Sequence, residues 1–280
     1  MTSVTSAPAF SDTEAVFRRW SGVIARTLMP AGERPGRELN LSLIKSNQRA
    51  QSYRAESAGR SAFLKLFDKH SRAGREAYTR ERDALLLLHG RDLVPRHLAH
   101  CDQDFFVLSE MIETQPQPDT PEDRQACVSL ARRCGAWLAE YEAVAPVRRH
   151  SGNWFDYLTN YDRYSHLLPL AQMQSWLADI PLCGSILSRC DNSLGNFMIR
   201  PDGSLAGCDF EQARFKPRGW DFAMTYQAFA MRWPLYHEEA LAALAAGFSS
   251  RHRGVLDIEE LTAVARALFI LEADTAIARG

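Results

Sequence analysis

A polar motif in the second half of the chain constrains its fold more than any other feature. Asp191 is followed five positions later by Asn196, and Asp209 comes thirteen positions after that. Between Asn196 and Asp209, the turn sequence Pro201-Asp202-Gly203 separates two short apolar runs, which predicts a β-hairpin. Phosphoryl transfer to a hydroxyl needs a carboxylate at the acceptor and oxygen ligands for a metal ion. This one segment contains side chains that can supply all of these groups.

The overall composition excludes several classes of protein. Hydrophobic residues make up 46% of the 280 residues and charged residues 24%, which are ordinary values for a globular protein with a substantial core. A net charge of −1 gives no basic surface, so we expect no nucleic-acid partner. No apolar run approaches the roughly 18 residues that a membrane span needs, and Met1–Phe10 does not resemble a signal peptide.

The six cysteines bear on the cellular compartment of the protein and do not indicate a metal site or disulfide bonds. Their spacing matches neither a metal-binding motif nor a disulfide framework. Several lie among apolar residues, where a free thiol packs as a small hydrophobe. Unpaired cysteines are typical of a reducing environment, and we therefore expect the protein to be cytoplasmic.

The first part of the chain has mainly the pattern of strands. A helix is expected from a capping box at Ser11 to just before Pro30, because apolar residues recur there at helical spacing. From Leu39 to Phe67 apolar residues alternate, with a turn at Ala58-Gly59-Arg60. This pattern predicts about three antiparallel strands, with Lys65 inside the last of them.

A charged helix and a further apolar run complete this first part. The spacing of apolar residues predicts a helix over Gly74–His89, which carries both Glu76 and Glu81. Another apolar run follows at Phe105–Met111. We expect residues 1–111 to form one domain, made of the N-terminal helix and a small lobe rich in strands.

The second part of the chain, residues 112–280, is predicted to be mainly helical. Ile112–Thr120 contains two prolines and has the composition of a linker. Helices are expected from Pro121 onward, from about Trp154 to Leu167, and over most of the chain after Trp220. Strands followed by helices in this order indicate an α+β fold with two lobes.

The ordered motifs resemble those of the aminoglycoside phosphotransferase and choline kinase group, small-molecule kinases with a protein-kinase-like fold. The most specific part is Asp191-Asn192-Ser193-Leu194-Gly195-Asn196-Phe197, followed by Asp209-Phe210-Glu211 and Trp220-Asp221-Phe222-Ala223. The resemblance extends over roughly Leu41 to Ala230. It implies a small antiparallel-sheet lobe that binds ATP and a helical lobe with the catalytic and metal-binding loops. A protein kinase is less well matched, because no activation segment with an A-P-E-like end follows Asp209.

The resemblance also implies roles in the helical lobe. Asp191 would be the catalytic base that receives or orients the acceptor hydroxyl, and Arg189 would be a second catalytic residue that hydrogen-bonds the loop and neutralises charge. Asn196 and Asp209 would hold Mg²⁺ against the phosphates of the nucleotide. Asp221 is interpreted as a structural residue that holds this region by hydrogen bonds.

Further roles are implied in the strand-rich lobe. Lys65 matches the strand lysine that contacts the α- and β-phosphates. Glu81 best matches the helix glutamate that pairs with this lysine, and Glu76 is the competing candidate. The backbone from Glu110 to Ile112 falls where adenine would be bound.

Three departures from the family pattern leave a second hypothesis open. Arg189-Cys190 replaces the usual His-Gly before the catalytic Asp, and the expected phosphate-covering turn, residues 46–52, has no glycine. Tyr141-Glu142-Ala143 stands where Leu-His-Ala is common. The principal hypothesis is an enzyme that transfers the γ-phosphate of ATP to a hydroxyl of a small molecule. The alternative is a kinase-like binding module without catalytic activity.

Two aromatic groups bear on the acceptor. One is Trp154, Tyr157, Tyr161 and Tyr164, and the other is Tyr226, Phe229, Trp233 and Tyr236. Spacing of this kind usually reflects packing in a core, which we favour over a cage for a choline-like amine. Arginines among the acidic residues of the last third argue modestly against a polycationic antibiotic. A sugar, an amino alcohol or another hydroxylated metabolite stays open.

Overall fold

The computed structural model of this chain describes residues 13–28, 39–117, 120, 122–161, 164–165, 168–252 and 256–277. The chain divides into two compact units. Unit 1 is Met1–Glu113 together with Phe210–Gln212, and unit 2 is Thr114–Asp209 together with Ala213–Gly280. The segment that follows Asp209 therefore packs with the first unit, although the rest of its sequence neighbourhood belongs to the second.

Unit 1 is built on a five-stranded antiparallel sheet with the order β1-β2-β3-β5-β4. Its strands are β1 (Asn40–Ser46), β2 (Ala50–Ser57), β3 (Arg60–Phe67), β4 (His97–Cys101) and β5 (Phe106–Glu110). The three strands predicted over Leu39–Phe67 are confirmed, as is the turn at Ala58. The apolar run at Phe105–Met111 forms β5, whereas β4 was not predicted.

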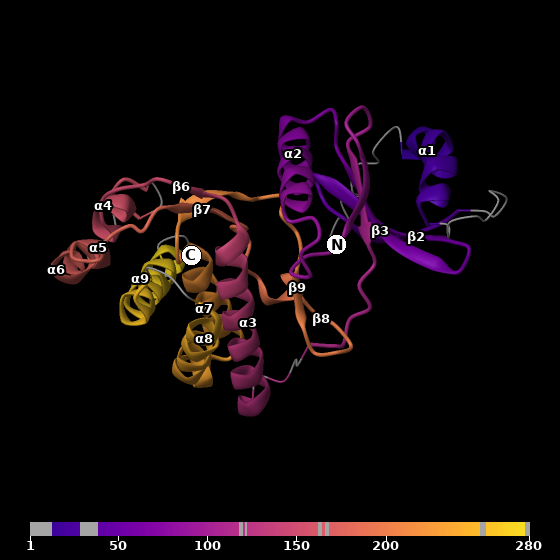
Figure 1. Ribbon diagram of the computed structural model, residues 1–280. Coiled ribbons are helices and arrows are strands. Elements are labelled where there is room, and N and C mark those ends of the chain that lie inside the picture. The colour runs from indigo at the N-terminus through magenta and orange to yellow at the C-terminus, as the bar shows by residue number, and fades with distance from the viewer. Residues whose placement is uncertain are drawn as a thin grey trace, which may run out of the picture. The chain divides into compact units, whose positions relative to one another are not determined.

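Alternation along β3 directs its side chains to two different helices. Leu64 and Leu66 face α1 (Thr13–Leu28) and join a core cluster with Ile24. Lys65 and Phe67 lie on the opposite face, because successive residues of a strand point to opposite sides. That face is covered by α2 (Arg72–Leu87), so α1 and α2 flank the sheet in Figure 1.

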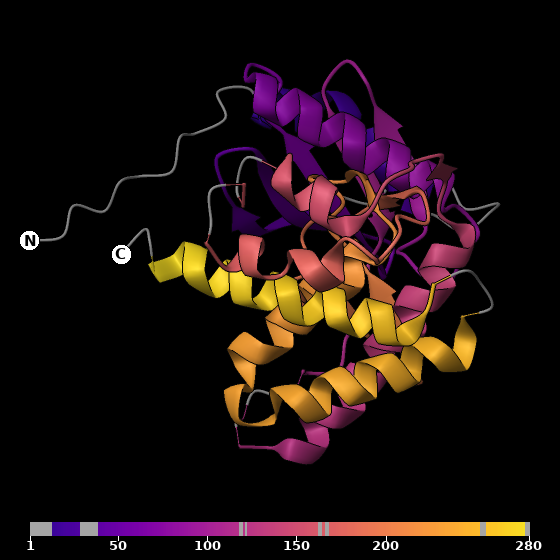
Figure 2. The same ribbon diagram turned by 90° about the vertical axis from the view of Figure 1, so that its left-hand side faces the viewer.

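Unit 2 is mainly helical, and Figures 1 and 2 show its four longest described helices packed side by side. These are α3 (Arg124–Val144), α7 (Trp220–Arg232), α8 (His237–Arg251) and α9 (Ile258–Ile277), accompanied by the short α4 (Trp154–Thr159), α5 (Leu168–Gln172) and α6 (Gln174–Leu177). Two small antiparallel sheets complete the unit, one of β10 (Arg214–Pro217), β7 (Ser185–Ser188) and β6 (Val147–Arg148), the other of β8 (Phe197–Ile199) and β9 (Leu205–Gly207). The β8–β9 pair is the hairpin predicted from the sequence.

Two helix boundaries differ from the prediction. The helix expected from Pro121 begins at Arg124, because the Asp123 carboxylate accepts the Ala126 amide and serves as the N-cap. Pro121 itself lies outside the described residues, as does Ser11 of the predicted capping box. The helix expected over 154–167 ends at Thr159.

A close crossing of α3 and α8 determines the packing of unit 2. A Cβ atom on Gly135 would lie 2.0 Å from the Leu244 carbonyl oxygen, and one on Gly247 would lie 2.0 Å from the Arg132 carbonyl oxygen. The backbones of α3 and α8 are therefore in direct contact at these two glycines, which have no side chain. Only glycine permits this approach at either position.

Substitution of Gly135 by Ala is accordingly expected to lower the free energy of unfolding by about 3 kcal/mol, the upper range for overpacking a core. Urea or thermal unfolding followed by circular dichroism measures the change. Gly22→Ala in α1 is the matched control, because an added Cβ there would have nothing within 4 Å and alanine favours a helix interior over glycine. Equal stabilities of the two variants would contradict the proposed crossing.

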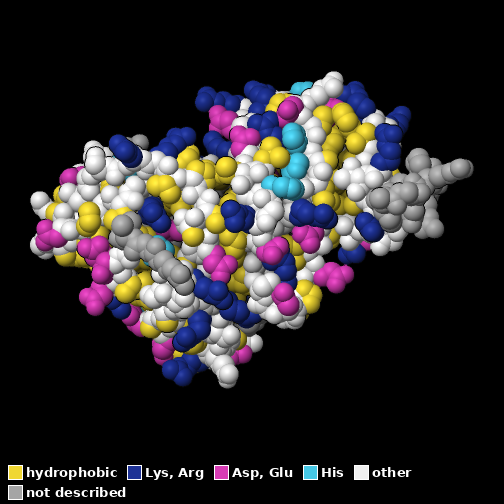
Figure 3. Space-filling view, in the orientation of Figure 1, with side chains coloured by type: hydrophobic (Ala, Val, Ile, Leu, Met, Phe, Trp, Pro, Cys, Tyr) yellow, Lys and Arg dark blue, Asp and Glu magenta, His cyan; other side chains and the backbone are white. Residues whose placement is uncertain are grey.

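The surface of the described chain carries charges of both signs. In the view of Figure 3, basic and acidic side chains are interspersed, and histidines gather on the first unit. The two histidines of β4, His97 and His100, have ring nitrogens 3.1 Å apart. Burial lowers the pKa of His97. Within the described ranges, no helix combines the length and the apolar character needed to cross a membrane.

Candidate active site

The hairpin in unit 2 brings Asn196 and Asp209 to the same end of two paired strands. Phe197 of β8 pairs with Gly207 of β9, and the Cys208 amide donates to the Asn196 carbonyl oxygen at 2.9 Å. Asn196 precedes the first strand and Asp209 follows the second. The hairpin register therefore places the two predicted metal ligands beside each other.

Asp191 lies in the loop between β7 and this hairpin. Its Oδ1 accepts the Ser193 amide at 3.2 Å, and its carbonyl oxygen accepts the Asn196 side-chain amide at 3.3 Å. The Asp191 side chain is half-buried, so part of the carboxylate is open to solvent. The structure thus brings the predicted base and the first predicted metal ligand together in one loop.

Asp221 holds this loop from the first turn of α7. Its buried carboxylate accepts hydrogen bonds from the Ser188 hydroxyl at 2.6 Å, the Asn192 side chain at 2.7 Å and the Arg189 amide at 3.1 Å. The structural interpretation of Asp221 is confirmed. Asn192 has no role in the sequence prediction, yet it connects Asp221 to the Arg189 side chain.

Arg189 lies beneath the loop rather than at its surface. Its side chain is fully buried and donates to the Asn196 carbonyl oxygen at 3.0 Å and to Asn192 Oδ1 at 3.1 Å. The guanidinium also lies 4.1 Å from the centre of the Phe197 ring and 4.9 Å from that of Trp137. Arg189 therefore fixes the conformation of the loop through its hydrogen bonds to Asn192 and Asn196 and its contacts with the two rings.

The backbone around the loop explains one departure from the family pattern. Cys190 has φ +64°, in the left-handed region that glycine adopts without strain. This is the position where a Gly is usual before the catalytic Asp, so the loop keeps a glycine-like conformation with a cysteine in it. Asp209 also has a positive φ, +63°. Burial raises the pKa of the Cys190 thiol, which keeps it protonated.

The departure from the family pattern at Tyr141-Glu142-Ala143 also has a structural function. The Tyr141 hydroxyl donates to the Leu187 carbonyl oxygen at 2.6 Å and supports β7 just before the loop. The buried Glu142 carboxylate accepts the Gly219 amide at 2.9 Å and lies 3.3 Å from Arg218. Burial raises the pKa of Glu142. Both side chains of α3 thus fix the strands and the helix start that frame Asp191.

Unit 1 carries a separate set of charged residues around Lys65. The Lys65 ammonium lies 3.0 Å from Glu211 and 3.9 Å from Glu81, and all three side chains are less than a tenth exposed. Arg49 lies 3.5 Å from the same Glu211 carboxylate. Glu81 also accepts the amide of Phe210. Lys65 and Glu81 were identified from the sequence, whereas Glu211 and Arg49 were not.

The choice between Glu81 and Glu76 is settled by the two faces of α2. Glu76 forms ion pairs with Arg72 and Arg80 on the outer face. Glu81 lies on the buried face, close to Lys65.

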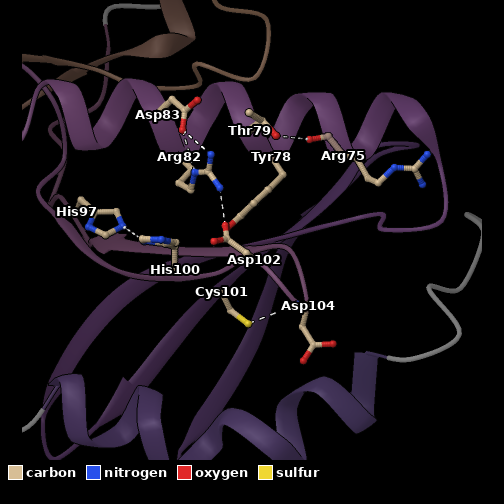
Figure 4. Close-up of polar contacts among 10 residues, drawn as sticks. All are labelled: Arg75, Tyr78, Thr79, Arg82, Asp83, His97, His100, Cys101, Asp102 and Asp104. Carbon is tan, nitrogen blue, oxygen red and sulfur yellow. Dashed lines mark hydrogen bonds and ion pairs between the residues drawn. The ribbon is translucent and has the colours of Figure 1, made fainter.

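A polar anchor holds α2 on the sheet. The Tyr78 hydroxyl and the Arg82 guanidinium both donate to Asp102, in the turn after β4 (Figure 4). These donors lower the pKa of Asp102, Tyr78 having the larger effect. The anchor fixes α2 within one turn of Glu81.

The predicted phosphate-covering turn is closed by its own side chain. Asn47 Oδ1 accepts the amides of Arg49 and Ala50, each at 2.8 Å. These two amides are therefore already satisfied within the turn. The turn instead carries the guanidinium of Arg49.

At the predicted hinge, the two residues differ in what their backbones can offer. The Glu110 amide donates to the Arg96 carbonyl oxygen at 2.8 Å and is therefore occupied. Ile112 follows the end of β5, and its amide makes no backbone hydrogen bond with any residue that the structure describes. The Ile112 amide is the better donor for an adenine ring.

The donor set of the loop fits Mg²⁺. This ion prefers oxygen ligands and keeps several waters, so one amide oxygen, one carboxylate and the substrate phosphates suffice. Asn196 uses its amide nitrogen toward Asp191, which turns the side-chain oxygen away from that bond. No cluster of three or more His, Cys, Asp or Glu suited to a metal occurs in the described part of the chain.

The two aromatic groups have different surroundings. Tyr226, Phe229 and Trp233 are fully buried, which confirms core packing for these three, whereas Tyr236 is half-buried. In the other group Trp154 and Tyr164 are also buried, but Tyr157 and Tyr161 are only half-buried. These two rings, with Trp220, surround the ammonium of Lys216. Lys216 was not identified from the sequence.

The fold and these groups define a class of protein, the kinase-like phosphotransferases. An antiparallel sheet with a buried Lys–Glu pair and a helical unit with an Asp–Asn–Asp loop are both present. The sequence matches the phosphotransferase enzyme family over residues 40–258, and the chain belongs to that family. No curated protein matches the sequence.

Solved structures confirm the predicted fold. Choline kinase LicA from Streptococcus pneumoniae has a TM-score of 0.60 at 14% identity, covering 95% of this chain and 91% of its own. Macrolide 2'-phosphotransferase MphH from Brachybacterium faecium has a TM-score of 0.59 at 17% identity, covering 92% and 88%. Aminoglycoside phosphotransferase APH(4)-Ia, in a ternary complex with ADP and hygromycin B, has a TM-score of 0.51 at 10% identity, covering 92% and 99%.

Proposed function

We propose that this protein is an ATP- and Mg²⁺-dependent phosphotransferase that moves the γ-phosphoryl group of ATP to a hydroxyl of a small molecule. The observation that carries the proposal is the catalytic loop. Asp191, Asn196 and Asp209 lie in one loop and hairpin, and a buried hydrogen-bond network centred on Asp221 fixes that loop. Membership of the phosphotransferase family supports the reaction class.

In this proposal Asp191 takes the proton from the acceptor hydroxyl. The hydroxyl oxygen forms the new bond to the γ-phosphorus, and the bond from that phosphorus to the β–γ bridging oxygen breaks, which releases ADP. Mg²⁺, when bound, neutralises charge on the phosphates, and Asn196 and Asp209 would hold it. Arg189 positions the loop and makes no contact with the reacting atoms.

Lys65 is proposed to contact the α- and β-phosphates of ATP. Its ammonium is already oriented by Glu81 and Glu211, so its position requires little rearrangement on binding. The adenine would bind at Glu110–Ile112, with the Ile112 amide as donor. A structural relative with ADP bound supports an adenine nucleotide as the phosphate donor.

The proposed setting is the cytoplasm, where ATP is abundant. All six cysteines lie in the described ranges and are reduced thiols, as is usual in a reducing compartment.

A binding module without catalysis is the second candidate. The specific observation in its favour is the turn at Asn47, whose side chain occupies two amides that would otherwise face a phosphate. The strained Cys190 beside Asp191 is a second departure. Such a module would hold a nucleotide or another ligand without requiring the metal.

Thermal unfolding with ATP separates the two candidates. For the enzyme, ATP with Mg²⁺ is expected to raise the Tm clearly more than ATP with EDTA, because a ligand that binds the native state stabilises it in proportion to its affinity. Equal shifts with and without metal would favour the binding module. No shift with ATP or GTP at any concentration would contradict the proposed enzyme.

A further inference from the structure

Lys216 is a buried cation held by aromatic rings instead of a carboxylate. Lys216 is only 6% exposed. Its ammonium lies 4.0 Å from the centre of the Tyr161 ring and 4.4 Å from the centre of the Trp220 ring. The ammonium donates a hydrogen bond to the Tyr157 hydroxyl at 3.2 Å. Among the residues that the structure describes, no Asp or Glu forms an ion pair with Lys216.

This arrangement leaves the ammonium able to bind a further acceptor group. An ammonium has three N–H donors, and the Tyr157 hydroxyl accepts one. The ring faces stabilise the positive charge but accept only weakly, and a buried charge is costly unless it is paired and hydrogen-bonded. An anionic ligand group would complete the coordination of Lys216.

The strand that carries Lys216 lies next to the catalytic loop. Lys216 pairs with Ile186, and Arg214 pairs with Ser188, the last residue of β7 before the loop. Because residues two apart on a strand share a face, Arg214 and Lys216 point to the same side of β10. Both positive charges act on the thiol of Cys190, the residue before Asp191, against the effect of its burial.

The space between the rings of Tyr157, Tyr161 and Trp220 is therefore filled by the ammonium of Lys216. Three rings around a positive charge would suit an amine ligand if the centre were open. With Lys216 at the centre, a quaternary or primary amine would meet a like charge in a partly buried setting, which opposes binding.

We propose that Lys216 binds an anionic group of the phosphate acceptor, and that the acceptor is a hydroxylated molecule bearing a carboxylate or a phosphate. This inference rests on the proposed function, since it names the substrate class of the same site. Tyr157, Tyr161 and Trp220 hold the ammonium in place, and Arg214 adds positive charge on the same face. Choline-like acceptors are excluded from this position.

Titration of three matched three-carbon probes, together with choline, tests the proposal. Glycerate, glycerol 3-phosphate, glycerol and choline are added to the full chain, and the Trp220 indole N–H signal is followed by NMR, with Trp220→Phe used for assignment. One or both anions are expected to shift the signal at a concentration at least about tenfold lower than glycerol does, as for a hydrogen bond to a charged group. The stronger of the two anions identifies the carboxylate or the phosphate class. Choline is expected to cause no shift.

Variants of Lys216 show whether the lysine causes this preference. Lys216→Met is expected to remove the preference for anions over glycerol and to allow choline to shift the signal, whereas Lys216→Arg keeps the preference because it keeps the charge. Lys45→Met, which removes an exposed strand lysine, is the matched control and should titrate like the wild type. Lys216→Gln serves as a second neutral variant if Lys216→Met does not fold.

Three results would overturn the inference. These are a choline shift in the wild type equal to that of the anions, an anion preference that survives in the neutral variants, and the absence of a shift with any probe. ATP binding is measured by thermal unfolding in the same samples. A loss of ATP binding with a retained anion preference would contradict the proposed function and not the assignment of Lys216.

Discussion

Asp191→Asn is expected to lower kcat for phosphoryl transfer by about 10²- to 10⁴-fold, the range that general base catalysis contributes. Asparagine keeps the shape of the side chain and can still accept the Ser193 amide, but it cannot take the proton of the acceptor hydroxyl. A coupled assay of ADP release, with an acceptor found in a screen of hydroxylated acids, sugars and amino alcohols, measures the change. Affinity for ATP should stay close to the wild-type value, because the loop is fixed by Asp221 rather than by Asp191.

Asp202→Asn is the control for this variant. Asp202 lies in the exposed turn of the same unit, and the same chemical change there should leave turnover unaffected. Wild-type turnover in Asp191→Asn would rule out Asp191 as the base. A loss of ATP binding in Asp191→Asn would indicate instead that the carboxylate has a structural role.

Lys65→Met is expected to have two large effects. It removes a donor to the transferring phosphate chain, which should lower kcat/KM by about 10²- to 10³-fold. It also leaves the buried Glu81 and Glu211 carboxylates beside each other without the shared cation, which should cost about 3–5 kcal/mol of stability. Steady-state kinetics and urea unfolding measure the two effects separately.

The double variant Lys65→Met with Glu211→Gln distinguishes the two effects. Neutralising Glu211 removes one of the two buried carboxylates that have lost the shared Lys65 cation, so part of the lost stability should return while activity does not. Recovery of activity together with stability would mean that Lys65 is only structural. Full activity of the single variant would exclude the proposed contact with the phosphates.

Much of the fold could be predicted because local patterns agree with the final structure. Alternation of apolar residues within Leu39–Phe67, with the turn at Ala58-Gly59-Arg60, predicted the three strands and placed Lys65 inside the last one. The Pro201-Asp202-Gly203 turn predicted the hairpin of β8 and β9. Each of these signals depends on a few neighbouring residues.

The failed helix over residues 154–167 shows where such signals mislead. Its four aromatic residues have helical spacing, but α4 ends at Thr159 and Asn160 binds the Asp156 carbonyl oxygen through its side chain. Tyr161 lies beyond the helix and packs on Trp220 and Lys216. The spacing therefore reflects contacts with distant residues, which a local pattern cannot distinguish from one helix face.

The residues of the candidate site also fall into two groups, those that local sequence patterns predict and those that depend on distant partners. Asp191, Asn196 and Asp209 were recognisable because their spacing is fixed by one loop and one hairpin. Glu211, Asn192 and Lys216 were not, because their significance depends on partners far away in the sequence or on burial. The pairing of Lys65 with Glu211 joins residues 146 positions apart, and no periodicity in either segment indicates it.

The hydrogen-bond network around Asp221 affects how much of the free energy of acceptor binding can contribute to catalysis. All of its members belong to unit 2, so the network that shapes the loop is formed within that unit. In the proposed mechanism, the loop that carries Asp191 is therefore already fixed before any substrate arrives. Acceptor binding then need not supply free energy to organise Asp191, and more of that free energy is left to stabilise the transition state.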